Sequence, residues 1–92
     1  MSEPSLTFTA FVLSLASTAA VHFGDLPDPN SGERAPENLA GAAQMIEILA
    51  LLDQKTRGNL SAEERALLEQ LLYELRMRFV EASSAGRRIV EP

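Results

Sequence analysis

The chain has few residues that could perform chemistry, because it contains one histidine and no cysteine. His22 stands three residues before Asp25, so the carboxylate could orient the imidazole as a general base requires. A histidine at the end of a helix also interacts favourably with the helix dipole. No other part of the chain resembles an active site, so we interpret His22 as a capping or interface residue and predict no enzymatic activity and no catalytic residue.

The segment from Asp28 to Gly32 begins with oxygen-bearing side chains at alternate positions, as in a calcium-binding EF-hand loop. That loop also needs an oxygen ligand at its fifth position, glycine at its sixth and glutamate at its twelfth, and this chain has Gly32, Glu33 and Leu39 there. Asp followed by Pro is typical of a type I turn instead. We predict a turn at Asp28–Ser31, and we expect neither a metal nor a cofactor.

The balance of charge constrains the partners. The net charge is −5, which disfavours nucleic acid and anionic lipid surfaces as partners. The absence of cysteine fits a reducing compartment. Glu3 precedes the first apolar segment, where a secretory signal would carry basic residues, so we expect a cytoplasmic protein.

The uncharged stretch TFTAFVLSLASTAAVHFG, residues 7–24, is apolar on nearly every side. It predicts a helix from about residue 5 to residue 23, ended by Gly24 in a left-handed conformation. Its length approaches that of a membrane span, but it contains six polar side chains and has acidic flanks, which disfavours a membrane helix. We therefore expect other protein to bury it.

Two further helices are predicted, at about 39–56 and 61–82, with a loop at 24–38. Ser61 and Glu64 have the spacing of a capping box, and Glu74 lies four residues before Arg78 in the order that favours an ion pair. The short link between the two helices predicts an antiparallel hairpin. The fold class is thus all-α, a single domain at 1–82 in which the apolar first helix packs on the hairpin, followed by a flexible tail at 83–92.

The first two helices carry more apolar surface than one buried face requires, and such a surplus usually marks an interface. We predict a homodimer or higher homo-oligomer centred on the first helix, through Phe8, Phe11, Val12, Ser14, Leu15, Thr18, Ala19, His22, Met45, Ile48 and Leu51. The corresponding function is a non-enzymatic interaction or scaffold protein that binds itself or a larger protein partner. Two alternatives are a carrier of a small apolar ligand, with a cavity among the first two helices and His22 as a polar contact, and an accessory subunit of a membrane-associated complex.

Two blocks of the sequence resemble a known family. FTAFVLSLASTAAVHFGDLPDP and MIEILALLDQKTRGNLSAEERALLEQLLYELRMRFVE are similar to the bacterial family catalogued as domain of unknown function 1844. The distinctive pieces are residues 22–24, the LPDP segment at 26–29, the core at 48–52 and the turn at 55–60. The resemblance covers roughly residues 8–81 and implies a small bacterial cytosolic helical protein. It implies no site residues.

Overall fold

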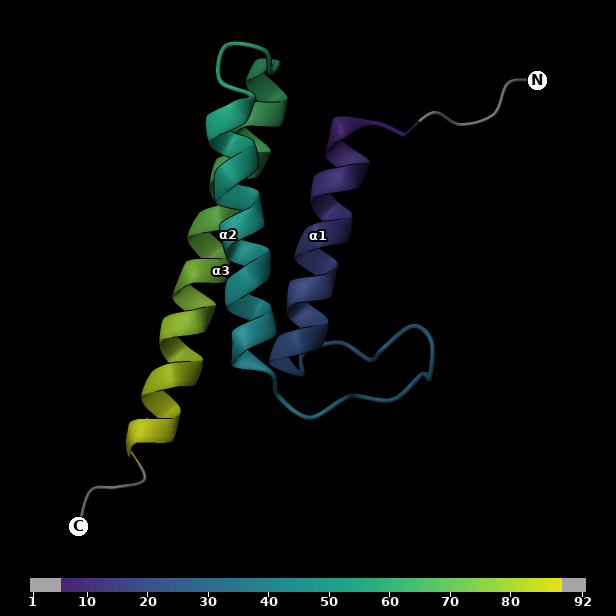
Figure 1. Cartoon of the computed structure of the whole chain (residues 1–92), viewed down its shortest axis with the longest axis vertical. Helices are drawn as coiled ribbons and strands as arrows, with labels where there is room; N and C mark the ends of the chain where they lie inside the picture. The colour runs from purple at the N-terminus through teal and green to yellow at the C-terminus, as the bar shows by residue number, and fades with distance from the viewer. Residues whose placement is uncertain (1–5, 89–92) are drawn as a thin grey trace.

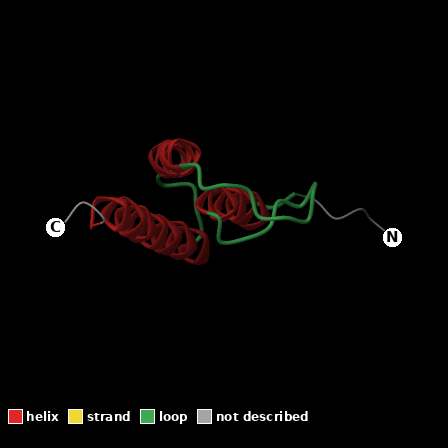
Figure 2. Ribbon diagram, turned by 90° about the horizontal axis from the view of Figure 1, so that it is seen from below, coloured by secondary structure: helices red, strands yellow, loops and turns green. Residues whose placement is uncertain are grey.

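The computed structural model describes the backbone of residues 6–88 and the side chains of residues 6–84. Within that part of the chain the structure consists of three helices and their connections: α1 at Phe8–Phe23, α2 at Leu39–Lys55 and α3 at Ala62–Arg88 (Figure 1). The chain reverses direction after each of the first two helices. Viewed end-on, the three helices lie at the corners of a triangle (Figure 2). The predicted all-α fold of a helix packed on a hairpin is confirmed.

The ends of α1 are set by single residues. The Thr7 hydroxyl oxygen accepts a hydrogen bond from the Ala10 amide at 3.0 Å, so Thr7 is the N-cap and the helix begins at Phe8. At the other end Gly24 has φ 84°, the left-handed conformation that terminates a helix at little cost for glycine. The predicted end is confirmed. The predicted start near residue 5 is wrong, because residues 6 and 7 are described and precede the helix.

The helical hairpin is set by local capping. The Asn38 carboxamide oxygen accepts from the Gly41 amide at 3.0 Å and starts α2. The Ser61 and Glu64 capping box forms in both directions: the Glu64 amide donates to the Ser61 hydroxyl at 3.1 Å, and the Ser61 amide donates to the Glu64 carboxylate at 2.9 Å. These bonds fix the start of α3, one residue after the predicted boundary.

The predicted end of the third helix near Ala82 is wrong, because α3 continues to Arg88. Ala82 is buried against α1 and α2, so tertiary contacts hold the turn at which we expected the helix to fray. The following Ser83-Ser84 pair is only mildly unfavourable in a helix, and Gly86 costs about 1 kcal/mol relative to alanine without ending it. Of the predicted flexible tail, residues 83–88 are helical and residues 89–92 lie outside the described part.

The core has two clusters that differ in side-chain size. One contains the large residues Val12, Leu49, Leu68 and Leu72. The other contains Phe23 together with three alanines, one from each helix: Ala19, Ala42 and Ala82. Alanine has no side chain beyond Cβ, so the helices can approach one another closely around the Phe23 ring. The two clusters together hold α1 against the hairpin along its length.

Replacing Leu68 by alanine tests the first cluster. Leu68 is fully buried, so we expect Leu68→Ala to lower the free energy of unfolding by about 2–5 kcal/mol through lost burial and a residual cavity. Urea unfolding followed by circular dichroism measures the change. The control is Met77→Ala on the same helix, where the side chain is exposed and the expected change is within about 0.5 kcal/mol. Equal losses for the two variants would contradict this assignment of the core.

Candidate interaction surfaces

The predicted interface residues of α1 divide between the core and the surface. Val12 and Ala19 are fully buried by α2 and α3, so they belong to the core of the chain itself. Phe8, Leu15 and His22 are partly buried. The exposed residues form what we call the α1 outer face: Thr9, Ala10, Phe11, Leu13, Ser14, Ser17 and Thr18. Leu13, which was not among the predicted interface residues, is 44% exposed, compared with 37% for Phe11.

The predicted interface residues of α2 are less accessible as a group. Leu51 is exposed, whereas Met45 and Ile48 are partly buried. Met45 packs against the cluster around Phe23. The structure therefore supports only Leu51 of the three as a largely accessible apolar side chain.

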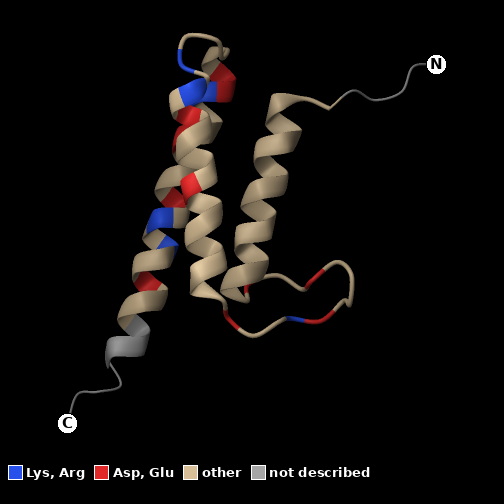
Figure 3. Cartoon of the chain, viewed as in Figure 1, with Lys and Arg blue, Asp and Glu red and all other residues tan. Residues whose placement is uncertain are grey.

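The α1 outer face carries no charge, and the hydroxyls of Ser14 and Thr18 bond to their own helix. Figure 3 shows α1 without a lysine, arginine, aspartate or glutamate along its length. The Ser14 hydroxyl donates to the Phe11 carbonyl at 2.7 Å, and the Thr18 hydroxyl donates to the Ser14 carbonyl at 3.1 Å. If a partner buried these two hydroxyls, they would keep their hydrogen bonds to the helix backbone. The usual free-energy cost of burying a polar group is therefore reduced.

His22 connects the end of α1 to the start of α2. Its carbonyl accepts a hydrogen bond from the Asn38 amide at 2.7 Å. Its ring lies so close to Gly41 that a Cβ atom on that residue would be 2.9 Å from ring atoms. The same Cβ atom would be 2.8 Å from the Asn38 side-chain nitrogen, so a residue larger than glycine fits at position 41 only if the His22 and Asn38 side chains move. The arrangement favours the interpretation of His22 as a residue that joins helix ends.

Asp25, the carboxylate that could have oriented the His22 imidazole, forms an ion pair with α3 instead. The Arg78 guanidinium donates two hydrogen bonds to the Asp25 carboxylate, at 2.8 and 2.9 Å, and lies 5.1 Å from the centre of the Phe23 ring. Hydrogen bonding from Arg78 lowers the pKa of Asp25 below its ordinary value of 3.8. The predicted Glu74–Arg78 pair is wrong, because Arg78 is directed to Asp25 and the Glu74 carboxylate accepts instead from the side-chain amide of Gln70 at 3.0 Å.

The loop after α1 contains the predicted turn. The Ser31 amide donates to the Asp28 carbonyl at 3.2 Å, and the Asn30 amide donates to the Asp28 carboxylate at 2.9 Å. The carboxylate that resembled a calcium ligand thus stabilises the turn from within. A search of the described residues found no cluster of three potential metal-ligating side chains.

Sequence reasoning missed an apolar surface on α3. Tyr73, Met77 and Val80 are 65%, 51% and 56% exposed, and we call them the α3 outer stripe. They recur at intervals of four and three residues, so they share one side of the helix, away from the buried Leu68 and Leu72. The sequence does show this surface, as a second set of apolar residues with helical spacing that falls on a different side of the helix from the core residues.

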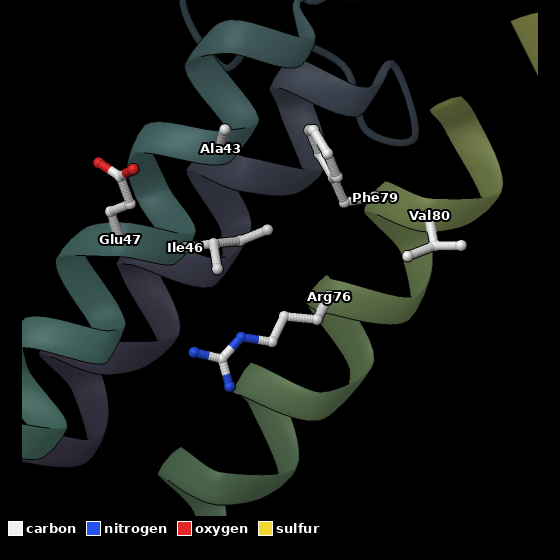
Figure 4. A pocket seen from close by; sticks show the side chains of 6 residues that line it. All are labelled: Ala43, Ile46, Glu47, Arg76, Phe79 and Val80. Atoms are coloured by element: carbon white, nitrogen blue, oxygen red, sulfur yellow. The ribbon is translucent and has the colours of Figure 1, made fainter. Parts of the chain in front are cut away.

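A hollow of about 280 Å³ lies beside this stripe, between α2 and α3 (Figure 4). Its lining is Ala43, Ile46, Glu47, Arg76, Phe79 and Val80. The carrier hypothesis placed a cavity among the first two helices with His22 on its wall. Neither α1 nor His22 lines this hollow, whereas His22 lines a hollow of about 300 Å³ between α1 and the following loop. Its volume is just below the range of about 300–1,000 Å³ typical of small-molecule pockets.

Comparison with known proteins identifies the family. The sequence model of one protein family, the domain of unknown function DUF1844, matches residues 5–81. The chain belongs to this family. The match includes α1, α2 and most of α3, so both exposed apolar surfaces of this DUF1844 chain lie within the matched region. No match was found among the curated proteins or among the solved structures.

Within the described residues of this DUF1844 chain, no helix has both the length and the apolar character needed to cross a bilayer.

Removal of the Asp25 carboxylate tests the ion pair. Because the folded-state pKa of Asp25 is lowered, its contribution to stability is complete above the ordinary carboxyl range and is lost as the pH falls below 3.8 through the lowered pKa. Asp25 is partly exposed, so solvent screening limits the expected loss in Asp25→Asn to about 1 kcal/mol or less at neutral pH. Unfolding free energies from pH 7 to pH 2 measure both effects. Glu33→Gln in the same loop is the control, and identical profiles for Asp25→Asn and the unmodified chain would contradict the prediction.

A double-mutant cycle tests the contact between His22 and Gly41. The added methyl of Gly41→Ala would lie within 3 Å of both the His22 imidazole and the Asn38 side-chain nitrogen. We therefore expect Gly41→Ala to lower the free energy of unfolding by less when His22→Ala has already removed the imidazole. The expected coupling is about 1 kcal/mol, measured from four urea unfolding curves. Additive effects of the two substitutions would show that the imidazole moves away without cost.

Proposed function

We propose that this chain is a non-enzymatic cytoplasmic interaction or scaffold protein that self-associates through the α1 outer face. The observation that carries the proposal is that this face is uncharged, partly apolar, and internally satisfied at Ser14 and Thr18. Such a surface loses little on leaving water and gains from burying Phe11 and Leu13. A cysteine-free sequence is compatible with the reducing cytoplasm.

The charge of the chain favours α1 over other surfaces for self-association. Each copy carries a net charge of −5, so two copies repel one another when their acidic surfaces meet. The acids of the described residues lie on α2, α3 and the loop (Figure 3). Contact through α1 places no like charges directly opposite each other, which supports a second copy as the occupant of this face.

The sizes of the side chains support a helix-to-helix contact. Ala10, Ser14 and Ser17 are small and would let the backbone of a second α1 approach closely. Phe11 and Leu13 are the large residues of the face and would supply most of the apolar burial. A two-fold axis would repeat each contact, giving a symmetric dimer in which Val12 and Ala19 remain in the core of each copy.

The substitution Leu13→Asp tests self-association. Because a two-fold contact would bury the new carboxylate in both copies, we expect the dimer dissociation constant to rise by about 100-fold, equivalent to about 2.7 kcal/mol. Sedimentation equilibrium across micromolar concentrations measures it, with circular dichroism to verify folding. The matched control is Val80→Asp on α3, which should leave the oligomer unchanged.

Two results would overturn the proposal. One is a stable monomer of the unmodified chain at micromolar concentration. The other is an oligomer whose affinity is unaffected by Leu13→Asp.

A further inference from the structure

The α3 outer stripe has the spacing of a helix-binding seam. Tyr73, Met77 and Val80 follow one another at intervals of four and three residues, the repeat by which one helix packs along another in coiled coils. All three are more than half exposed in the described structure. Because the stripe lies on the side of α3 that faces away from Leu68 and Leu72, a partner could align with it without displacing α1 or α2, beside which α3 runs (Figure 1).

The hollow between α2 and α3 extends the stripe into a shaped surface. Val80 belongs to the stripe and also lines the hollow, and Ala43, Ile46 and Phe79 form its apolar wall (Figure 4). At about 280 Å³ it is large enough to take a bulky apolar side chain. A ridge of exposed apolar residues beside such a pocket is the arrangement that anchors amphipathic helices.

The charges around this surface are mainly acidic. Glu74 and Glu81 flank the stripe on one side, and Glu47 stands on the rim of the hollow. The Glu81 carboxylate lies 3.9 Å from the Arg78 guanidinium but its side chain is 77% exposed, and the hydrogen bond that Glu74 receives comes from the neutral side-chain amide of Gln70. Arg78 also lines this surface, but it donates two short hydrogen bonds to Asp25, and Arg76 lines the hollow, so acidic side chains outnumber basic ones around the site. The local electrostatics therefore favour a cationic partner.

We propose that the α3 outer stripe and the adjoining hollow bind a basic amphipathic helix of another protein. Apolar residues of that helix pack on Tyr73, Met77 and Val80, and one bulky side chain enters the hollow. Its lysines or arginines pair with Glu74 and Glu81. A second copy of this chain would present the same acidic surroundings, so a partner of opposite charge fits the surface better. The site is separate from the α1 outer face and does not depend on self-association.

Two synthetic helical peptides probe the site. Both carry leucines at intervals of four and three residues, and one has lysines along a flank where the other has glutamates. Fluorescence anisotropy of labelled peptide titrated with the full chain should show binding of the lysine peptide only. Met77→Ser should weaken that binding by at least about tenfold, whereas Leu51→Ser, an exposed position on α2, should not change it.

Charge reversal tests the acidic flank. Glu74→Lys combined with Glu81→Lys should transfer the preference to the glutamate peptide. Glu33→Lys combined with Glu37→Lys changes the net charge equally but lies in the loop, so the preference for the lysine peptide should persist. Leu13→Asp should bind the lysine peptide normally even if it abolishes self-association, which separates this inference from the proposed function.

Three results would overturn the inference. The first is equal binding of the two peptides, or binding of neither. The second is an unchanged affinity in Met77→Ser. The third is a preference that switches to the same extent in the loop control, which would reveal attraction to the net charge rather than to the stripe.

Discussion

The close approach of the three helices around Phe23 is the constraint on which the rest of the structure depends. Ala19, Ala42 and Ala82 contribute one small side chain from each helix, so three backbones can surround one aromatic ring. Polar contacts at the same end support this packing, since the Asn38 amide bonds to the His22 carbonyl and Arg78 bridges to Asp25. These contacts fix the rotation of each helix about its axis and so decide which side chains face outward.

The outward-facing residues explain why this small protein has two apolar surfaces. α1 is apolar around most of its circumference, and the hairpin can cover only the side that carries Val12, Ala19 and Phe23. α3 is apolar on two opposite sides, and the side with Leu68 and Leu72 enters the core. The two remaining surfaces differ in electrostatic surroundings: the α1 outer face has no charge, and the α3 outer stripe has acidic neighbours. That difference suits them to different kinds of partner.

Local signals in the sequence predicted the elements well, because helix ends depend on residues close to one another. Gly24 in the left-handed conformation, Asn38 as a cap and the bonds between Ser61 and Glu64 each act within a few residues. The end of α3 was missed because Ala82 is held by α1 and α2, and that support is not visible in its own neighbourhood. The partner of Arg78 was missed for a related reason. Asp25, which is far away in the sequence, binds Arg78 in place of Glu74, which is one helical turn away.

What the sequence by itself determined is the number of helices, most of their boundaries, the family and the surplus of apolar residues on α1, because each follows from local spacing and composition. Only the tertiary structure decided how that surplus is divided. Val12 and Ala19 enter the core while Leu13 faces outward, since packing against α2 and α3 selects one rotation of the helix among several that an almost entirely apolar surface allows. The same selection leaves Tyr73, Met77 and Val80 on the outside of α3, because a helix at the corner of a three-helix bundle can bury only the side that faces its two neighbours.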